Sequence, residues 1–441
     1  MVVRGSDPVS RCREEGLELS ESALAPEVGP MSEGCGAGMI RRMRLPDHFS
    51  AQEALAELLS YPSAEGPRSL EGPFALYGAG KLGLMAMTFF ERVQLKPDLV
   101  IDANADRLRH SEAWRRWPMQ DPLHVPMRLK RSLPLVVSIA TTCFAELAAG
   151  LKAQGWCDVI PIYDVTEAYR TRYPLGNGWF MGDLTGTERT ATEQVLAAWS
   201  DDVSRAHHLQ FMAWHRLRQD WLFEGAPVET AHRYFIPEIS SVLGDREVFV
   251  DAGAHTGETA KAFRERVGNR FAEIIMFEPD SGNASLIEAG LEQLPGSLRQ
   301  KHRLLRLALS QTSGRQPFIP QLGYGSQLSS LGRDRVDTMA LDDMEVAPTY
   351  IKLHLEGHEL DALRGSERSL RLHRPILSVT TYHSDTGIWK LPSWLMGRMA
   401  DYRHYLRLHS WCGTGAVMYC VPAERIGARS NPKVSSWGER R

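Results

Sequence analysis

The chain has 441 residues, of which 43% are hydrophobic and 24% are charged, and its formal net charge is −3. This composition is that of a globular protein with two or three domains, and it excludes a chain that is disordered or fibrous throughout. The balance of charges gives no general attraction to nucleic acid, and no apolar run reaches the roughly 18 residues that a membrane span needs.

The six cysteines are scattered and show no Cys-x-x-Cys spacing. This pattern favours free thiols in a reducing cytoplasm over a disulfide scaffold or a zinc ribbon. We predict no metal site from the sequence. Residues 1–45 begin with a Gly-, Ser- and Glu-rich stretch that lacks the apolar core of a secretory signal, and we expect a disordered leader there.

Residues 46–165 are predicted to form a Rossmann-like domain. Helical spacing predicts helices over 46–64 and 84–93. Short apolar runs predict strands, namely 74–77, 99–101, 135–139 and 159–162. Strands that alternate with helices indicate a parallel sheet. Residues 166–245, with helical spacing over 187–223, are predicted to be a helical connector.

The α/β alternation returns in residues 246–424, which are predicted to form a second Rossmann-like domain. The expected strands are 248–251, 273–277, 303–309, 349–354, 376–382 and 416–421. Residues 425–441 are rich in Gly, Ser and Arg and are expected to be a flexible tail. The predicted fold class is therefore α/β, with two Rossmann-like domains joined by the helical connector.

The most informative pattern begins at the first strand of the second domain. Asp251, Gly253 and Gly257 form a D-x-G-x-x-x-G turn between a strand and a helix, and Glu278 closes the next strand. Glycines let the backbone approach a ligand, and an acid at the end of the second strand accepts both ribose hydroxyls of a nucleoside. A dinucleotide site would show G-x-G-x-x-G here, so the pattern favours S-adenosylmethionine (SAM).

Residues 232–421 resemble the FkbM-type methyltransferase family. The resemblance is carried by VDAGAHTGET, FEPD, YGSQLSS, VDTMALDD, IKLHLEGHELDALRG and RPILSVTTYH, in this order. It implies a class I SAM-methyltransferase fold, SAM as the cofactor, and O-methylation of a hydroxyl on a sugar, a glycoconjugate or a related natural product.

The resemblance also implies which residues bind SAM. Asp251, Gly253 and Gly257 would line its methionine end, and Glu278 would hold its ribose. The remaining cofactor candidates are His255, in the same glycine turn, and Ser310, beside the adenine.

This chain departs from the family at His354, where an aspartate is usual, and at His358, where a small residue is usual. His354 could serve as a neutral base, since the ordinary pKa of histidine is near 6.5. The alternative is a catalytically impaired methyltransferase-like module in glycan assembly.

The catalytic candidates follow the fourth and fifth strands, at the edge where open α/β sheets place their chemistry. We predict His383 as the general base and Glu356 as the residue that positions the acceptor, with His354 beside them. Two structural roles compete with this assignment. His383 could instead hydrogen-bond backbone at a strand end, and Glu356 could instead interact with a helix dipole.

The amino-terminal domain has its own glycine motif. Gly78, Gly80 and Gly83 follow a strand and open a helix, and Asp102 closes the next strand. This context predicts a site for a dinucleotide or a nucleotide sugar. The alternatives are an NAD- or nucleotide-sugar-binding oxidoreductase or accessory protein, and a fold kept for packing without a ligand.

Overall fold

The computed structural model describes residues 39–175 and 179–427. These residues belong to one compact unit, Gly36–Arg441. Residues 1–38 of the expected leader and 428–441 of the expected tail lie outside the described residues. Residues 39–45, which were counted with the leader, include the short strand β1 (Ile40–Met43).

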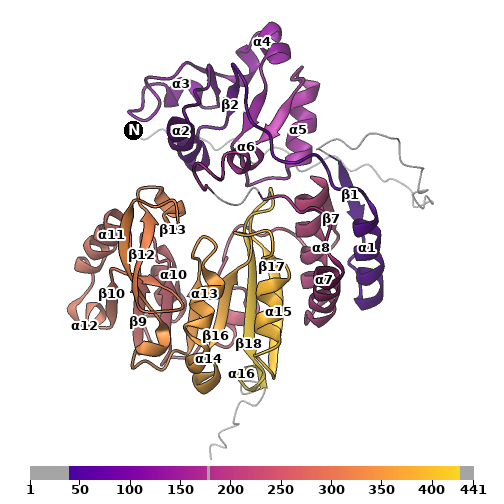
Figure 1. The fold of residues 1–441 in the computed structure, drawn as a ribbon. Coiled ribbons are helices and arrows are strands. Elements are labelled where there is room, and N and C mark those ends of the chain that lie inside the picture. Colours follow the sequence, from indigo (N-terminus) through magenta and orange to yellow (C-terminus); the bar gives the residue numbers. More distant parts are fainter. Residues whose placement is uncertain (1–38, 176–178, 428–441) are drawn as a thin grey trace, which may run out of the picture. The chain divides into compact units, whose positions relative to one another are not determined.

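The amino-terminal domain is built on a five-stranded parallel sheet (Figure 1). Its strands in spatial order are β4 (Met119–Gln120), β3 (Leu99–Ile101), β2 (Ala75–Tyr77), β5 (Leu135–Val137) and β6 (Val159–Pro161). Its helices include α2 (Lys81–Val93), α3 (Ala105–Leu108), α4 (Met127–Ser132), α5 (Phe144–Ala153) and α6 (Ile162–Ala168). The predicted parallel sheet is confirmed, with β4 as a strand that the sequence did not reveal.

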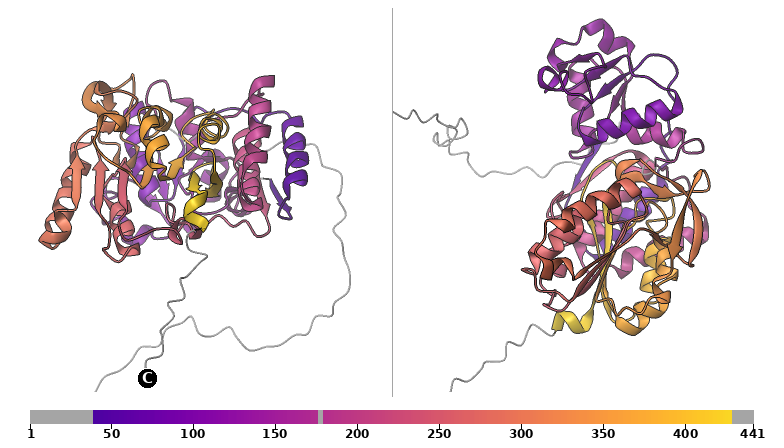
Figure 2. Two further views of the ribbon diagram at one scale, coloured as in Figure 1. Left: turned by 90° about the horizontal axis from the view of Figure 1, so that it is seen from below. Right: turned by 90° about the vertical axis from the view of Figure 1, so that its left-hand side faces the viewer.

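The carboxyl-terminal domain is built on a seven-stranded sheet with helices on both faces (Figure 2). Its strands in spatial order are β10 (His302–Leu305), β9 (Glu273–Phe277), β8 (Val248–Ala252), β15 (Tyr350–Leu353), β16 (Ile376–Thr380), β18 (Ala416–Pro422) and β17 (Tyr402–Leu408). β18 runs antiparallel to both of its neighbours, and the other pairs are parallel. This is the order of a class I methyltransferase sheet, so the predicted fold class is confirmed.

Apolar side chains on β8 and β15 pack this sheet against the helix α10 (Glu258–Arg266). Phe249 stacks on Phe263 with ring centroids 4.5 Å apart, and Tyr350 lies 4.9 Å from Phe249. All three side chains are buried. Burial of such a side chain contributes about 1.5–3 kcal/mol, so this cluster fixes α10, through Phe263, against the first residues of β8 and β15.

The connector is helical in part. It contains α7 (Gly186–Ala198) and α8 (Asp202–Leu217), and α7 begins with a capping box between Thr185 and Glu188. Figures 1 and 2 show both helices beside α1 (His48–Ser60), which confirms the helix predicted over 46–64. The predicted helical spacing ends too late, because Asp220–Phe223 form the strand β7, which pairs with β1.

The run 303–309 is two strands rather than the single strand expected. β10 ends at Leu305, and β11 (Ala308–Leu309) joins a separate four-stranded sheet. Its other strands are β12 (Gly314–Ile319), β13 (Gln327–Leu328) and β14 (Asp334–Met339).

The remaining helices of this domain are α11 (Ser281–Glu292), α12 (Gly296–Arg299), α13 (Glu359–Arg364), α14 (Glu367–His373), α15 (Lys390–Met396) and α16 (Ala423–Gly427). Over the described ranges, no helix has both the length and the apolar character to cross a membrane.

Candidate functional site

Each main sheet has one point where the chain order of its strands reverses. In the amino-terminal sheet this point lies between β2 and β5, and in the carboxyl-terminal sheet it lies between β8 and β15. Connections leave neighbouring strands in opposite directions there, and a crevice opens at their carboxyl ends. The glycine turns predicted from the sequence follow β2 and β8, so both turns lie at such a point.

The turn after β8 needs glycine at position 253 for two reasons. Its φ is +74°, in the left-handed region that disfavours a side chain, and a Cβ atom there would lie 2.0 Å from the carbonyl oxygen of His354. The Gly253 and Ala254 N–H groups both donate to the Phe277 carbonyl at 3.0 Å. The turn is therefore held tightly between β15 and β9, with bare backbone facing the crevice.

Glu278 lies where the sequence predicted it, at the end of β9 and beside this turn. One carboxylate oxygen accepts from the His255 N–H at 2.7 Å, and the other accepts from the Asp280 N–H at 3.0 Å. Burial raises the pKa of Glu278 to about 7, against the opposing effect of these N–H donors. When ionised, this carboxylate can therefore accept hydroxyl donors, and burial disfavours the ionised form.

Asp251 faces away from the crevice and forms a buried ion pair. Its carboxylate accepts from Lys352 Nζ at 2.9 Å, and the same ammonium donates to the Gly253 carbonyl at 2.8 Å. Burial raises the pKa of Asp251, although Lys352 opposes the shift. The pair ties β8 to β15 beneath the glycine turn.

A cavity of about 890 Å³ opens over these elements. Its lining includes three of the predicted cofactor residues, Gly253, His255 and Glu278. In the part of the chain that the structure describes, the other three, Asp251, Gly257 and Ser310, lie outside this lining. Gly257 has a φ of +82° and precedes α10, and Ser310 accepts a hydrogen bond from Gln316.

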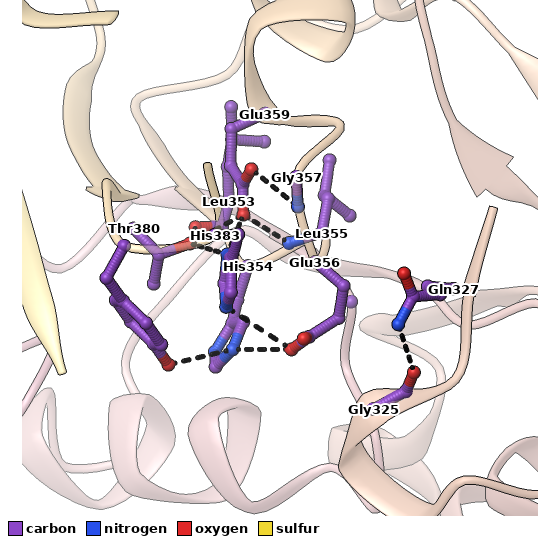
Figure 3. A network of polar contacts seen from close by, with 12 residues as sticks. Gly325, Gln327, Leu353, His354, Leu355, Glu356, Gly357, Glu359, Thr380 and His383 are labelled. Carbon is purple, nitrogen blue, oxygen red and sulfur yellow. Dashed lines mark hydrogen bonds and ion pairs between the residues drawn. The ribbon is translucent and has the colours of Figure 1, made fainter. Parts of the chain in front are cut away.

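The catalytic candidates lie together beyond the glycine turn (Figure 3). His354 Nε2 is 3.1 Å from Glu356 Oε1, and His383 Nε2 is 3.4 Å from the same oxygen. The side chains of Glu356 and His383 are 7% and 2% exposed. His354 and Glu356 line the large cavity, whereas His383 lines a small adjoining one of about 40 Å³.

Three further residues orient this cluster, and the sequence analysis assigned none of them. Glu359 accepts from His383 Nδ1 at 2.7 Å, and the hydroxyls of Tyr234 and Tyr382 lie 2.6 Å and 3.2 Å from the two ring nitrogens of His354. Glu359 stands two residues after Gly357 in the EGHEL segment, and its carboxylate accepts from the Leu355 and Gly357 N–H groups and from the Thr380 hydroxyl. Glu359 is the second acid in this segment, and its position could have indicated a residue that supports His383.

The charges in the cluster are strongly coupled. Burial lowers the pKa of His354 well below its usual range, and nearby positive groups add to this, so the ring is neutral. Burial lowers the pKa of His383, but the Glu356 and Glu359 carboxylates outweigh this effect and raise it above its ordinary value. Against the effect of burial, His383 in turn lowers the pKa of Glu359 to about 2. His383 therefore lies between two acids that favour a positive charge at its ring.

The amino-terminal glycine motif also borders the large cavity, through Gly78, Gly80 and Asp102. Gly83 serves packing, because a Cβ there would lie 2.2 Å from the Gly78 carbonyl oxygen. Asp102 holds the turn by accepting from the Ala79 N–H at 2.8 Å. The two domains meet at this cavity, where the Trp411 N–H donates to the Ala140 carbonyl at 2.9 Å.

Comparisons with known proteins agree with this geometry. Residues 251–408 match the family model described as the methyltransferase FkbM domain. This part of the chain is an FkbM-type methyltransferase domain. The expected family is thereby confirmed, and with it a methyltransferase of the kind that uses SAM.

The crystal structure of the methyltransferase FkbM from Methylobacillus flagellatus KT resembles this chain with a TM-score of 0.56 and 19% identity. The match covers 85% of this chain and 98% of that chain, so it extends well beyond the FkbM-type domain. At this identity the likeness shows the fold alone.

Two more structures match over smaller parts. One is an rRNA methylase from Streptococcus thermophilus, with 12% identity and a TM-score of 0.28; the match covers 42% of this chain and 90% of that chain. The other is a precorrin-6y C5,15-methyltransferase from Geobacter metallireducens, with 14% identity and a TM-score of 0.27; the match covers 44% of this chain and 90% of that chain. Scores this low carry no argument. A search of curated protein sequences finds no match.

Proposed function

We propose that this protein transfers a methyl group from SAM to a hydroxyl of a sugar, a glycoconjugate or a related natural product. The observation that carries the proposal is the buried cluster of His354, Glu356 and His383 beside the glycine turn of the FkbM-type domain. A hydroxyl is a weak nucleophile, and a base that takes its proton contributes about 10²–10⁴-fold in rate. Two imidazoles and a carboxylate at the strand ends suit an oxygen acceptor.

The described residues fit SAM. The backbone at Gly253 borders the large cavity and suits the methionine end, and the buried Glu278 carboxylate suits two ribose hydroxyls. Ala308 and Leu309 border the same cavity and offer apolar surface to an adenine. When bound, SAM supplies an electrophilic methyl group on a positively charged sulfur.

The proposal gives an indirect, positioning role to Asp251, Gly257 and Ser310. Asp251 holds Lys352, which in turn fixes the Gly253 carbonyl. Gly257 directly precedes α10, and Ser310 directly follows the strand β11, which ends at Leu309. These residues position the turn and the strand ends rather than contact the cofactor.

The proton of the acceptor hydroxyl passes to the Glu356–His383 pair. Glu356 reaches the large cavity, and His383 stands behind it with Nδ1 engaged by Glu359. Nε2 is then the ring position that takes or gives up a proton. Holding the acceptor in line supplies the larger share of the rate, since orientation is worth about 7–11 kcal/mol.

A nucleotide, or a nucleotide-linked acceptor, is proposed as the ligand of the amino-terminal domain. The specific observation in its favour is that Gly78, Gly80 and Asp102 border the same cavity as Gly253. The helix α2 begins directly after Gly80, and its free N–H groups suit a phosphate. We also propose a cytoplasmic location, which the free thiols among the described cysteines support.

The test is calorimetric titration of the purified protein with S-adenosylhomocysteine and, separately, with NAD⁺, followed by transfer from radiolabelled SAM to a panel of sugars and glycans. Binding of the first compound with label in a hydroxyl ether supports the proposal. Binding of NAD⁺ alone would overturn it and favour an oxidoreductase. Binding of S-adenosylhomocysteine with no transfer to any acceptor would favour the catalytically impaired module.

A further inference from the structure

We infer that His354, Glu356 and His383 form a binding site for a divalent transition-metal ion. Their candidate ligand atoms all lie within 4.8 Å of one another. The two Nε2 atoms are 3.1 Å and 3.4 Å from Glu356 Oε1. Metal–ligand bonds of about 2.0–2.2 Å at angles of 90–109° require ligand-to-ligand separations of roughly 2.8–3.6 Å. Both nitrogen–oxygen distances therefore already match the edges of a coordination polyhedron.

The orientation of His383 points to a ligand independently of these distances. Among the described residues, its Nε2 atom makes no hydrogen bond, although the side chain is only 2% exposed and the Glu356 carboxylate lies 3.4 Å away as an ion-pair partner. A buried polar atom without a partner costs about 1–3 kcal/mol. Figure 3 shows this atom directed toward Glu356 and His354. A cation at the centre of the three residues would give it a partner.

Each imidazole is also held from behind, as metal-binding imidazoles usually are. His383 donates its Nδ1 proton to Glu359 at 2.7 Å, and His354 Nδ1 faces the Tyr234 hydroxyl at 2.6 Å. These contacts direct the two Nε2 atoms inward. Glu359 already accepts from the N–H groups of Leu355 and Gly357, so it is an outer support rather than a ligand.

Two imidazoles and one carboxylate select the kind of metal. Mg²⁺ and Ca²⁺ prefer oxygen ligands, whereas Zn²⁺, Co²⁺, Fe²⁺ and Mn²⁺ accept this set. Three protein ligands leave positions open, and His354 and Glu356 border the large cavity. A hydroxyl bound there would lose its proton more readily. With Glu356 and His383 engaged as ligands, that proton would pass to solvent, and this route would replace direct transfer to the Glu356–His383 pair. That role rests on the proposed function, whereas the site itself rests on the three residues alone.

The experiment uses the full chain, stripped with a chelator and dialysed against Co²⁺ or Zn²⁺ without SAM or acceptor. Bound metal is measured by mass spectrometry, and the Co²⁺ visible spectrum reports imidazole ligation. We expect about one ion per chain, because the described residues contain one such set of three candidate ligands. His383→Gln should abolish the spectrum. Tyr234→Phe, which removes one oxygen and keeps the ring, should weaken binding by roughly 10–100-fold.

The matched control is His124→Gln, which removes an exposed histidine lying 3.6 Å from Asp121. It should bind metal as the unmodified protein does, and thermal melting checks that each variant folds. No bound ion, or equal binding by all variants, would overturn the inference and leave His383 as a charged group between Glu356 and Glu359. Titration with S-adenosylhomocysteine on the same samples tests the proposed function separately, because that cofactor site does not use the metal.

Discussion

The structure makes Glu278 the most direct test of the cofactor site. The perturbation is Glu278→Gln, which keeps the shape of the side chain and removes its charge. If the carboxylate holds two ribose hydroxyls, the substitution replaces a charged acceptor with an amide. Hydrogen bonds to charged groups contribute about 1.5–3 kcal/mol, which corresponds to roughly a 10- to 150-fold weaker affinity for S-adenosylhomocysteine.

The pH dependence sharpens this prediction. Because burial raises the pKa of Glu278 to about 7, the carboxyl is protonated in the free protein below that pH. The ionised form is the better acceptor, so affinity should rise with pH up to about 7 and then level off. At pH 6 only about a tenth of the carboxyl is ionised, and affinity should be about tenfold below its plateau. The backbone N–H groups of Asp280 and His255 lower this pKa, and the Asp280 carboxylate has a weaker, raising effect.

The assay is calorimetry at pH 6, 7 and 8 on the unmodified protein, Glu278→Gln and a control. Glu273→Gln is the matched control, because Glu273 begins the same strand and pairs with Arg303 far from the turn. The control should follow the unmodified protein at every pH. Glu278→Gln should bind weakly, with no change over this range. An affinity equal to that of the unmodified protein at pH 8 would remove Glu278 from the ribose site.

Three further predictions concern the catalytic cluster and the core. His383→Gln should lower methyl transfer by about 10²–10⁴-fold while leaving the calorimetric affinity for S-adenosylhomocysteine unchanged; equal turnover would exclude His383 from proton transfer. His354→Asp, which restores the residue usual in the family, should lower the measured turnover because it places a second carboxylate beside Glu356; a gain would indicate an impaired enzyme. Arg218→Ala should cost about 3–5 kcal/mol in urea unfolding, because it strands the buried carboxylate of Asp164, 2.6 Å away; a loss below about 1 kcal/mol would contradict this.

The sequence predicted the two main sheets well because their strands are buried on both faces. Short continuous apolar runs such as 248–251 and 376–382 are typical of central strands in a parallel sheet. The glycine turn after the first of them marks where that strand ends. The strands that it missed are edge or auxiliary strands. β4 has two residues, β1 and β7 pair only with each other, and β12 carries exposed polar residues. Their existence depends on partners distant in sequence, which local spacing does not reveal.

The candidate site was predictable as a list of residues but not as an arrangement. The D-x-G-x-x-x-G turn and Glu278 lie together as expected, because parallel strands bring their carboxyl ends to one edge. The direction of the Asp251 side chain was not predictable, since it depends on Lys352, which lies 101 residues further along the chain on the neighbouring strand β15. The same holds for Glu359 behind His383. These are side-chain contacts across the sheet, and only the register between β8, β15 and β16 sets them.

The residue at position 354 links the departure from the family to the metal inference. An aspartate there would put two carboxylates around His383, beside the acid that already holds it from behind. Histidine removes one negative charge and adds a nitrogen ligand, and the Tyr234 hydroxyl at 2.6 Å orients its ring. A buried neutral histidine that served only packing would not need a tyrosine hydroxyl at each ring nitrogen. The surroundings of His354 are therefore built for a histidine, which argues for adapted chemistry rather than for its loss.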